Sequence, residues 1–146
     1  MKLYTIGFTK KTAQQFFTLL KDNGVRCLVD IRVHPGGQLA GFARQADLPY
    51  FLAELARCDY VHVPSLAPTE EILTEYRKDH KWDKYVERFE ALMDERNIPK
   101  SLDRTLIEEK ACCLLCSEET PDKCHRRLVA ERIARTWPGF EIVHLK

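Results

Sequence analysis

Short apolar runs rich in β-forming residues alternate with longer stretches of helical periodicity, and this alternation constrains the fold more than any other feature of the chain. Five runs are predicted strands: residues 3–6 (LYTI), 27–31 (CLVDI), 60–63 (YVHV), 111–116 (ACCLLC) and 140–145 (FEIVHL). Helices are predicted at about residues 12–23, 49–57, 70–79, 81–97 and 123–137. The second and fourth runs are almost continuously apolar, as is typical of strands covered by helices on both faces. We therefore predict a three-layer α/β domain of about five mostly parallel strands with helices on both faces.

The composition is that of an ordinary globular protein. The 146 residues, 45% hydrophobic and 31% charged, suit a single domain spanning 1–146. No apolar stretch approaches the roughly 20 residues of a membrane span, so we expect no membrane association and a cytoplasmic location. The six cysteines are expected to be free thiols in a reducing compartment. A net charge of +1 means that any polyanion must be bound by a local patch, and the oligomeric state is left open.

Four chemically rich segments follow predicted strands. They are residues 7–9 (GFT), 30–37 (DIRVHPGG), 63–68 (VPSLAP) and 116–126 (CSEETPDKCHR). In open parallel sheets the ligand crevice lies at the carboxyl ends of the strands. We therefore expect these four segments to meet along one edge of the sheet.

Asp30 and Arg32 are two residues apart, so on a strand their side chains point the same way. An arginine in this place is suited to fork onto an anionic ligand, with Asp30 orienting it. The alternative is a buried ion pair that ties the strand to its loop. Gly36 and Gly37 after Pro35 are compatible with a loop that approaches a ligand closely.

The last predicted helix begins near a thiol and an imidazole. Asp122 is the expected N-cap, which places Lys123, Cys124 and His125 in the first turn. The positive end of the helix dipole favours a thiolate there, so Cys124 is a candidate nucleophile, with His125 beside it. The alternative is a structural thiol packed under the helix start.

Cys116 and Glu118 end the fourth strand with the same two-residue spacing. Glu118 is expected to project into the crevice, as a general acid or base or as a partner that holds Arg126 or Arg32. Neither Cys116 nor Cys124 is followed by the arginine of a C-x5-R loop. Cys113 and Cys116 should face opposite sides of the strand, which disfavours a zinc site built on them. A metal site from Cys116, Cys124 and His125, with or without Glu118, stays open as an alternative, but no metal ligand or cofactor is part of the predicted site.

The same segments, in the same order, resemble the DUF488 family of uncharacterised bacterial and archaeal α/β proteins. The matching motifs are Thr5-Ile6-Gly7, Asp30-Ile31-Arg32 with Pro35, Val61-His62-Val63-Pro64, Cys116-Ser117-Glu118 and Cys124-His125-Arg126. The chain departs from the family pattern at Phe8-Thr9, at Gly36-Gly37 and at Leu66-Ala67-Pro68. The resemblance implies the fold and the pocket, with a loose link to DNA repair and no established reaction.

The sequence thus leads to a polar anion-binding pocket at the strand carboxyl ends, for a phosphate-bearing small molecule or a nucleic-acid fragment. The predicted ligand-binding residues are Gly7, Asp30, Arg32, Pro35, Pro64, Cys116 and Arg126, and the predicted reactive residues are Cys124, His125 and Glu118. If the protein is an enzyme, a hydrolase-like activity using Cys124 or Glu118 is expected. Two alternatives remain: a non-catalytic nucleic-acid-binding or interaction module that uses the basic last helix, and a Cys/His metal-linked or redox protein.

Overall fold

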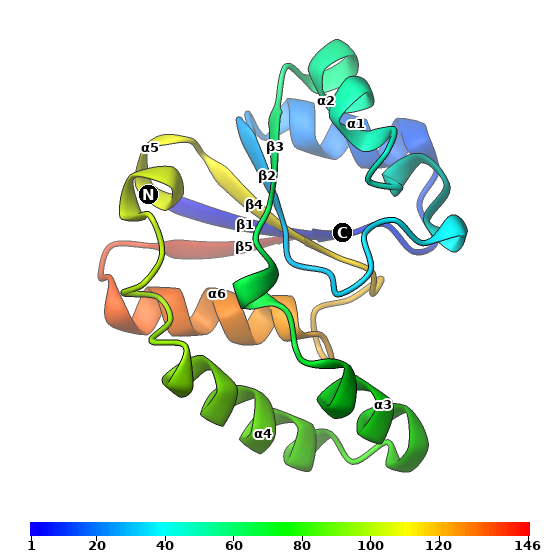
Figure 1. The fold of residues 1–146 in the computed structure, drawn as a ribbon. Helices are drawn as coiled ribbons and strands as arrows, with labels where there is room; N and C mark the ends of the chain where they lie inside the picture. The colour runs from blue at the N-terminus through cyan, green and yellow to red at the C-terminus, as the bar shows by residue number, and fades with distance from the viewer.

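A computed structural model describes the backbone of residues 1–146 and all side chains except those of residues 38–40. Its centre is one five-stranded parallel sheet in the order β3-β2-β4-β1-β5, shown in Figure 1. The strands are β1 (Lys2–Gly7), β2 (Cys27–Asp30), β3 (Asp59–His62), β4 (Cys112–Cys116) and β5 (Glu141–Leu145). The predicted α/β class and the five parallel strands are confirmed.

Six α-helices and two short 3-10 helices connect the strands within the described backbone. They are α1 (Ala13–Asp22), η1 (Gln38–Ala43), α2 (Leu48–Ala56), η2 (Pro64–Leu66), α3 (Glu70–Asp79), α4 (Trp82–Glu95), α5 (Arg104–Glu109) and α6 (His125–Thr136). The short α5, capped by the Asp103 side chain on the Thr105 N–H, was not predicted. Six residues are too few to establish a helical period in the sequence, so this helix depends on its cap and on packing of Ile107.

Helices cover both faces of the sheet (Figure 1). One face packs against α1 and α2, through side chains such as Phe16 and Leu52, and the other packs against α3 to α6. Residues of β4 alternate between these two cores: Cys113 points toward α1 and α2, whereas Leu114 points toward α6. This alternation explains why β4 is apolar at every position.

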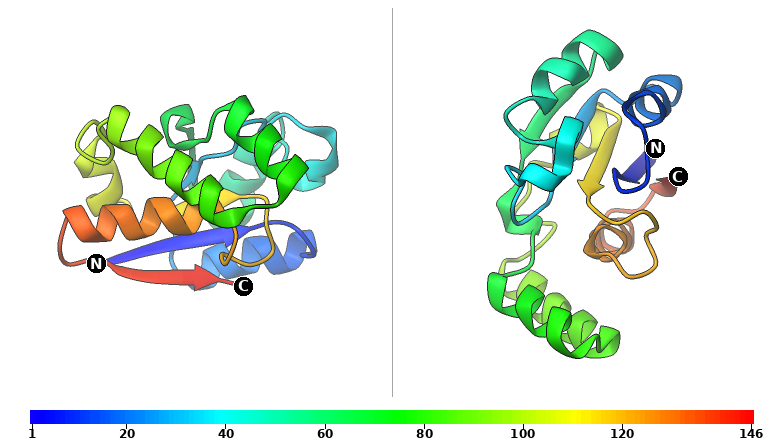
Figure 2. Two further views of the ribbon diagram at one scale, coloured as in Figure 1. Left: turned by 90° about the horizontal axis from the view of Figure 1, so that it is seen from below. Right: turned by 90° about the vertical axis from the view of Figure 1, so that its right-hand side faces the viewer.

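The strand order creates a crevice between β2 and β4. The chain leaves β2 toward β3 at one edge of the sheet, and it leaves β4 toward β5 at the other edge. Adjacent parallel strands whose connections diverge in this way form a topological switch point, where α/β proteins hold ligands. Figure 2 shows that the α3–α4 hairpin projects away from the sheet beside this end of the molecule.

All six cysteines are buried and carry free thiols, as expected. In the part of the chain that the structure describes, none of the helices is both long enough and apolar enough to cross a membrane.

Candidate functional site

A cavity of about 480 Å³ lies at the switch point, and we call it the switch-point cavity. All four segments expected at this edge contribute to it, together with residues of α3 and α4 that were not expected. The lining residues are Phe8, Arg32, Val33, His34, Gly37, Pro68, Leu73, Tyr76, Arg77, Trp82, Tyr85, Cys116, Ser117, Glu118, Lys123, Cys124 and His125. This volume is within the range of about 300–1,000 Å³ that small-molecule sites occupy.

Arg32 follows β2 and is held by Asp30 in a bidentate ion pair. Its Nε donates to Oδ1 of Asp30 over 2.8 Å and its Nη2 donates to Oδ2 over 2.7 Å. Nη2 also donates to the Ala43 carbonyl, and the Tyr60 hydroxyl donates to Asp30 Oδ2 over 2.6 Å. Burial and this bond to Asp30 raise the pKa of Tyr60, so the hydroxyl remains a donor. Asp30 therefore orients Arg32 in the cavity wall.

One guanidinium nitrogen of Arg32, Nη1, takes no part in these hydrogen bonds. Arg32 is only 4% exposed, and its Nη1 has no hydrogen-bond partner among the described residues. A buried guanidinium N–H without a partner is unfavourable by about 1–3 kcal/mol. Arg32 lines the cavity, so the site includes a buried cationic group with one donor nitrogen that lacks an acceptor among the described residues.

Cys116, Cys124 and His125 form a buried cluster, which we call the thiol–imidazole cluster, and all three line the cavity. The two Sγ atoms and a ring nitrogen lie within 4.8 Å of one another. Nδ1 of His125 is 3.4 Å from Sγ of Cys116, and Nε2 is 2.7 Å from the Ile31 carbonyl oxygen. Cys116 lies two residues after Leu114 on β4, so its side chain points to the same face of the sheet, the face that α3 to α6 cover.

The two thiols of the cluster have opposite pKa shifts. Burial alone would raise the pKa of Cys124, but hydrogen bonds from Cys116 and His125 and the positive charge of Arg126 hold it well below its ordinary value. The hydrogen bond to Cys124, together with burial, raises the pKa of Cys116. One ionised and one protonated sulfur are therefore favoured when the two share the cluster.

The start of α6 differs from the prediction. Cys124, not Asp122, is the N-cap, with extended backbone angles (φ −132°, ψ 139°), and the helix begins at His125. Residues 121–124 form a separate turn, closed by the Cys124 N–H on the Pro121 carbonyl, so Asp122 and Lys123 lie outside the helix. Cys124 still lies at the positive end of the helix dipole.

Arg126 and Gly7 hold the loop after β4 rather than lining the cavity. Arg126 is fully buried: Nε donates to Thr5 Oγ1 over 3.3 Å, and Nη1 donates to the Glu118 carbonyl over 2.7 Å. A Cβ at Gly7 would lie 1.6 Å from that same carbonyl oxygen. The bond to Arg126 is made by the Glu118 backbone, and the exposed Glu118 carboxylate, which was expected to hold an arginine, forms no ion pair with any described side chain.

The prolines and glycines expected in the loops differ in whether they line the cavity. Pro64 is exposed at the start of η2 and does not line the cavity, whereas Pro68 does. Pro35 is buried, and its carbonyl accepts from the Gln45 N–H. Gly37 lines the cavity with a φ of −62°, so the loop makes no use there of the left-handed angles open to glycine.

Sequence reasoning missed an aromatic wall on the α3–α4 hairpin. Tyr76, Trp82 and Tyr85 line the cavity, and the Trp82 and Tyr85 rings stack with centroids 4.9 Å apart. Arg77 lies beside them, exposed and without an ion pair to any described side chain. The available signal was the spacing of aromatic residues around a turn between two helices, which is also typical of simple core packing. Phe8, in the loop after β1, also lines the cavity.

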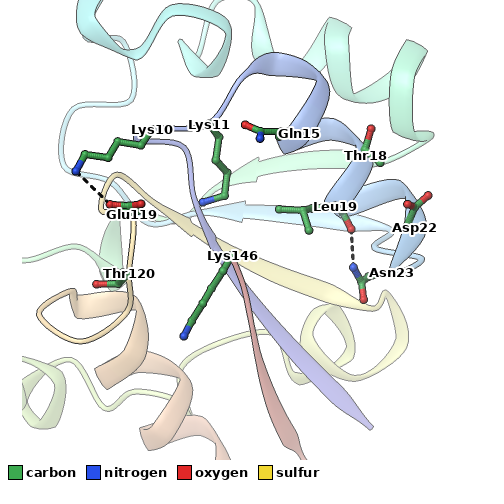
Figure 3. A pocket seen from close by; sticks show the side chains of 10 residues that line it. All are labelled: Lys10, Lys11, Gln15, Thr18, Leu19, Asp22, Asn23, Glu119, Thr120 and Lys146. Atoms are coloured by element: carbon green, nitrogen blue, oxygen red, sulfur yellow. Dashed lines mark hydrogen bonds and ion pairs between the residues drawn. The ribbon is translucent and has the colours of Figure 1, made fainter.

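A second cavity, of about 540 Å³, lies between α1 and the loop after β4 (Figure 3). It contains Lys10, Lys11 and Lys146, and the Lys10 ammonium is 3.5 Å from the Glu119 carboxylate. Burial and the nearby Arg126 lower the pKa of Lys11. It is slightly larger than the switch-point cavity but holds neither the thiol–imidazole cluster nor Arg32, so we place the candidate site at the switch point.

Comparison with known proteins gives one match. The family model described as "Domain of unknown function DUF488" matches residues 12–133. No curated protein and no solved structure shows significant similarity to the chain.

Proposed function

The chain belongs to the DUF488 family, a domain of unknown function, and from the site itself we propose that it binds an anionic small molecule with a flat ring in the switch-point cavity. The observation that carries this proposal is Arg32, a buried guanidinium fixed by Asp30, whose Nη1 has no partner among the described side chains. Arginine held in a defined orientation is the side chain best suited to bind a phosphate or carboxylate.

The other walls supply complementary chemistry. Arg77 and Lys123 are exposed cations at the cavity, and neither is neutralised by an ion pair with a described side chain. Trp82 and Tyr85 of α4 add aromatic surface to the cavity lining, which favours a planar ring. A phosphate-bearing nucleotide has both features, and the cavity volume is suited to a molecule of that size.

The ion pairs of α6 argue against the basic-helix alternative. Arg132 bonds to Glu90 and Asp94 on α4, and Arg127 pairs with Glu131. Charges neutralised in this way contribute little to phosphate binding. The basic run in the sequence is therefore largely a bridge between α6 and α4.

Fluorescence of Trp82 provides a direct binding assay in a Trp137→Phe background, because these are the two tryptophans of the chain. We expect nucleoside 5′-monophosphates to quench this signal at saturable concentrations and the corresponding nucleosides to bind more weakly. Loss of one charge-assisted contact costs about 1.5–3 kcal/mol, so Arg32→Lys should weaken binding about 10- to 100-fold. Lysine is chosen because it keeps a positive charge beside Asp30 but lacks the planar guanidinium that can donate two parallel hydrogen bonds to an anion.

Arg135→Ala is the matched control, because Arg135 is exposed on α6 away from the cavity lining. It should leave nucleotide affinity unchanged, while Lys123→Ala should lower it several-fold. Weaker binding in Arg135→Ala than in Lys123→Ala, or preferential binding of oligonucleotides with steep salt dependence, would support the interaction-module alternative instead.

A further inference from the structure

The thiol–imidazole cluster contains three side chains that are common ligands of transition metals. We propose that Cys116, Cys124 and His125 form a zinc-binding site with its fourth position open to the switch-point cavity. The inference stands on these three side chains and does not require the ligand proposed above.

The spacing of the three atoms is close to that of a tetrahedral site. With Zn–S distances of about 2.3 Å and Zn–N distances of about 2.0–2.1 Å, tetrahedral angles place sulfur and nitrogen about 3.6 Å apart and two sulfurs about 3.8 Å apart. Cys116 Sγ and His125 Nδ1 are 3.4 Å apart, and all three ligand atoms lie within 4.8 Å of one another. Small side-chain rotations would suffice to close the site.

The histidine is held in the orientation that a metal requires. A carbonyl oxygen only accepts hydrogen bonds, so the 2.7 Å contact with Ile31 places the ring proton of His125 on Nε2. A metal-bound imidazole is neutral, and with the proton on Nε2 its lone pair would be on Nδ1, which faces Cys116. A backbone carbonyl that fixes the second nitrogen is the usual outer-shell support of a metal-binding histidine.

The choice of metal follows from the ligands and their burial. Two thiolates and an imidazole favour zinc over magnesium or calcium, which prefer oxygen ligands. Zn²⁺ with two thiolates and a neutral imidazole has no net charge, so the occupied site can remain buried without a further counterion. Both sulfurs bind as thiolates, so metal binding would release to solvent any proton that the cluster still carries on them. Since all three ligand residues line the cavity, the fourth position is available to water or to a donor atom of a cavity ligand.

The chain contains a matched control. Cys112 is also buried in β4, on the same core face as Cys116, and lies beside Cys27 of β2. Its Sγ donates to the Leu106 carbonyl, and the structure shows no histidine grouped with this thiol pair among the described residues. Cys112→Ala thus removes a buried thiol of the same strand without touching the proposed site.

The test is titration of reduced, chelator-treated protein with Co²⁺, followed by Zn²⁺. We expect one Co²⁺ per chain, a thiolate-to-cobalt charge-transfer band in the near ultraviolet, intense visible bands of four-coordinate Co²⁺, and displacement by Zn²⁺. Cys116→Ala and Cys124→Ala should weaken binding by more than the 10- to 100-fold typical of an outer-shell change, and Cys112→Ala should not. Circular dichroism checks that each variant is folded.

The wild-type spectrum decides the matter even if a variant fails to fold. Absence of the charge-transfer band in reduced wild-type protein would overturn the proposal, as would bands that persist in Cys116→Ala or disappear in Cys112→Ala. Nucleotide quenching of Trp82 in chelator-treated protein is a separate measurement, so failure of the metal site and failure of the ligand site are distinguishable.

Discussion

The ion pair between Asp30 and Arg32 allows a quantitative prediction about Asp30→Asn. Asparagine keeps the shape of the side chain but removes its charge, so Arg32 would remain buried, at 4% exposure, with the Ala43 carbonyl as its other acceptor. The asparagine amide would also oppose the Arg32 Nη2 or the Tyr60 hydroxyl, which both donate to Asp30 now. Breaking a buried pair from one side is unfavourable by about 3–5 kcal/mol.

Urea denaturation followed by circular dichroism measures this loss. With an m-value of about 2 kcal/mol per M, the midpoint of Asp30→Asn should fall by roughly 1.5–2.5 M. Because domains of this size are stable by about 5–15 kcal/mol, the variant should still fold. If anions can reach Arg32 from the cavity, added inorganic phosphate should raise the midpoint of Asp30→Asn more than that of wild type.

Asp47→Asn is the control, because Arg44 and Asp47 form a half-buried pair with a similar N···O distance of 2.9 Å. The two side chains are 44% and 46% exposed, so this pair should contribute less than about 1 kcal/mol. A similarly small shift of the urea midpoint in both variants would refute the reasoning. It would mean that breaking the buried Asp30 pair costs no more free energy of unfolding than breaking the Asp47 pair.

Two further predictions concern the loop after β4 and its surroundings. In Gly7→Ala the new Cβ would lie 1.6 Å from the Glu118 carbonyl oxygen, so the loop must move and lose its bond to Arg126; we expect destabilisation of about 3 kcal/mol or more by urea denaturation. Burial and the nearby Arg126 lower the pKa of His144 below its ordinary value of 6.5. The unfolded chain therefore binds the proton more tightly, so this contribution to stability is complete above pH 6.5 and is lost as pH falls through the folded pKa. The free energy of unfolding should decline less between pH 6.5 and 5 in His144→Gln, and an unchanged slope would contradict the assignment.

The sheet and the location of the cavity could be predicted because each depends on strong local patterns. The unbroken apolar runs of β2 and β4 predict central parallel strands, and the polar residues after them must then meet at one edge. The pairing of Asp30 with Arg32 was also foreseeable, because their spacing is set by the pleat of the strand.

Features that depend on tertiary contacts were not visible in the sequence. Asp122 has the chemistry of an N-cap, but residues 121–124 form a turn, and the helix begins two residues later than predicted, at His125. Arg126 follows His125 directly, yet the helix directs its side chain to Thr5 and the Glu118 carbonyl rather than into the cavity. The aromatic wall depends on how the α3–α4 hairpin docks, which no local pattern encodes.

The position of β1 has a consequence for synthesis on the ribosome. This strand is translated before the other four, but its two neighbours in the sheet are β4 and β5, with Lys2 opposite Glu141 and Gly7 opposite Cys116. Its hydrogen-bonding strand partners therefore become available only after more than a hundred further residues have been translated. Until then β1 is an unpaired, aggregation-prone segment. We expect the nascent chain to depend on chaperones, or on burial of β1 against α1, until β4 and β5 have been translated. The complete sheet should therefore form late in folding.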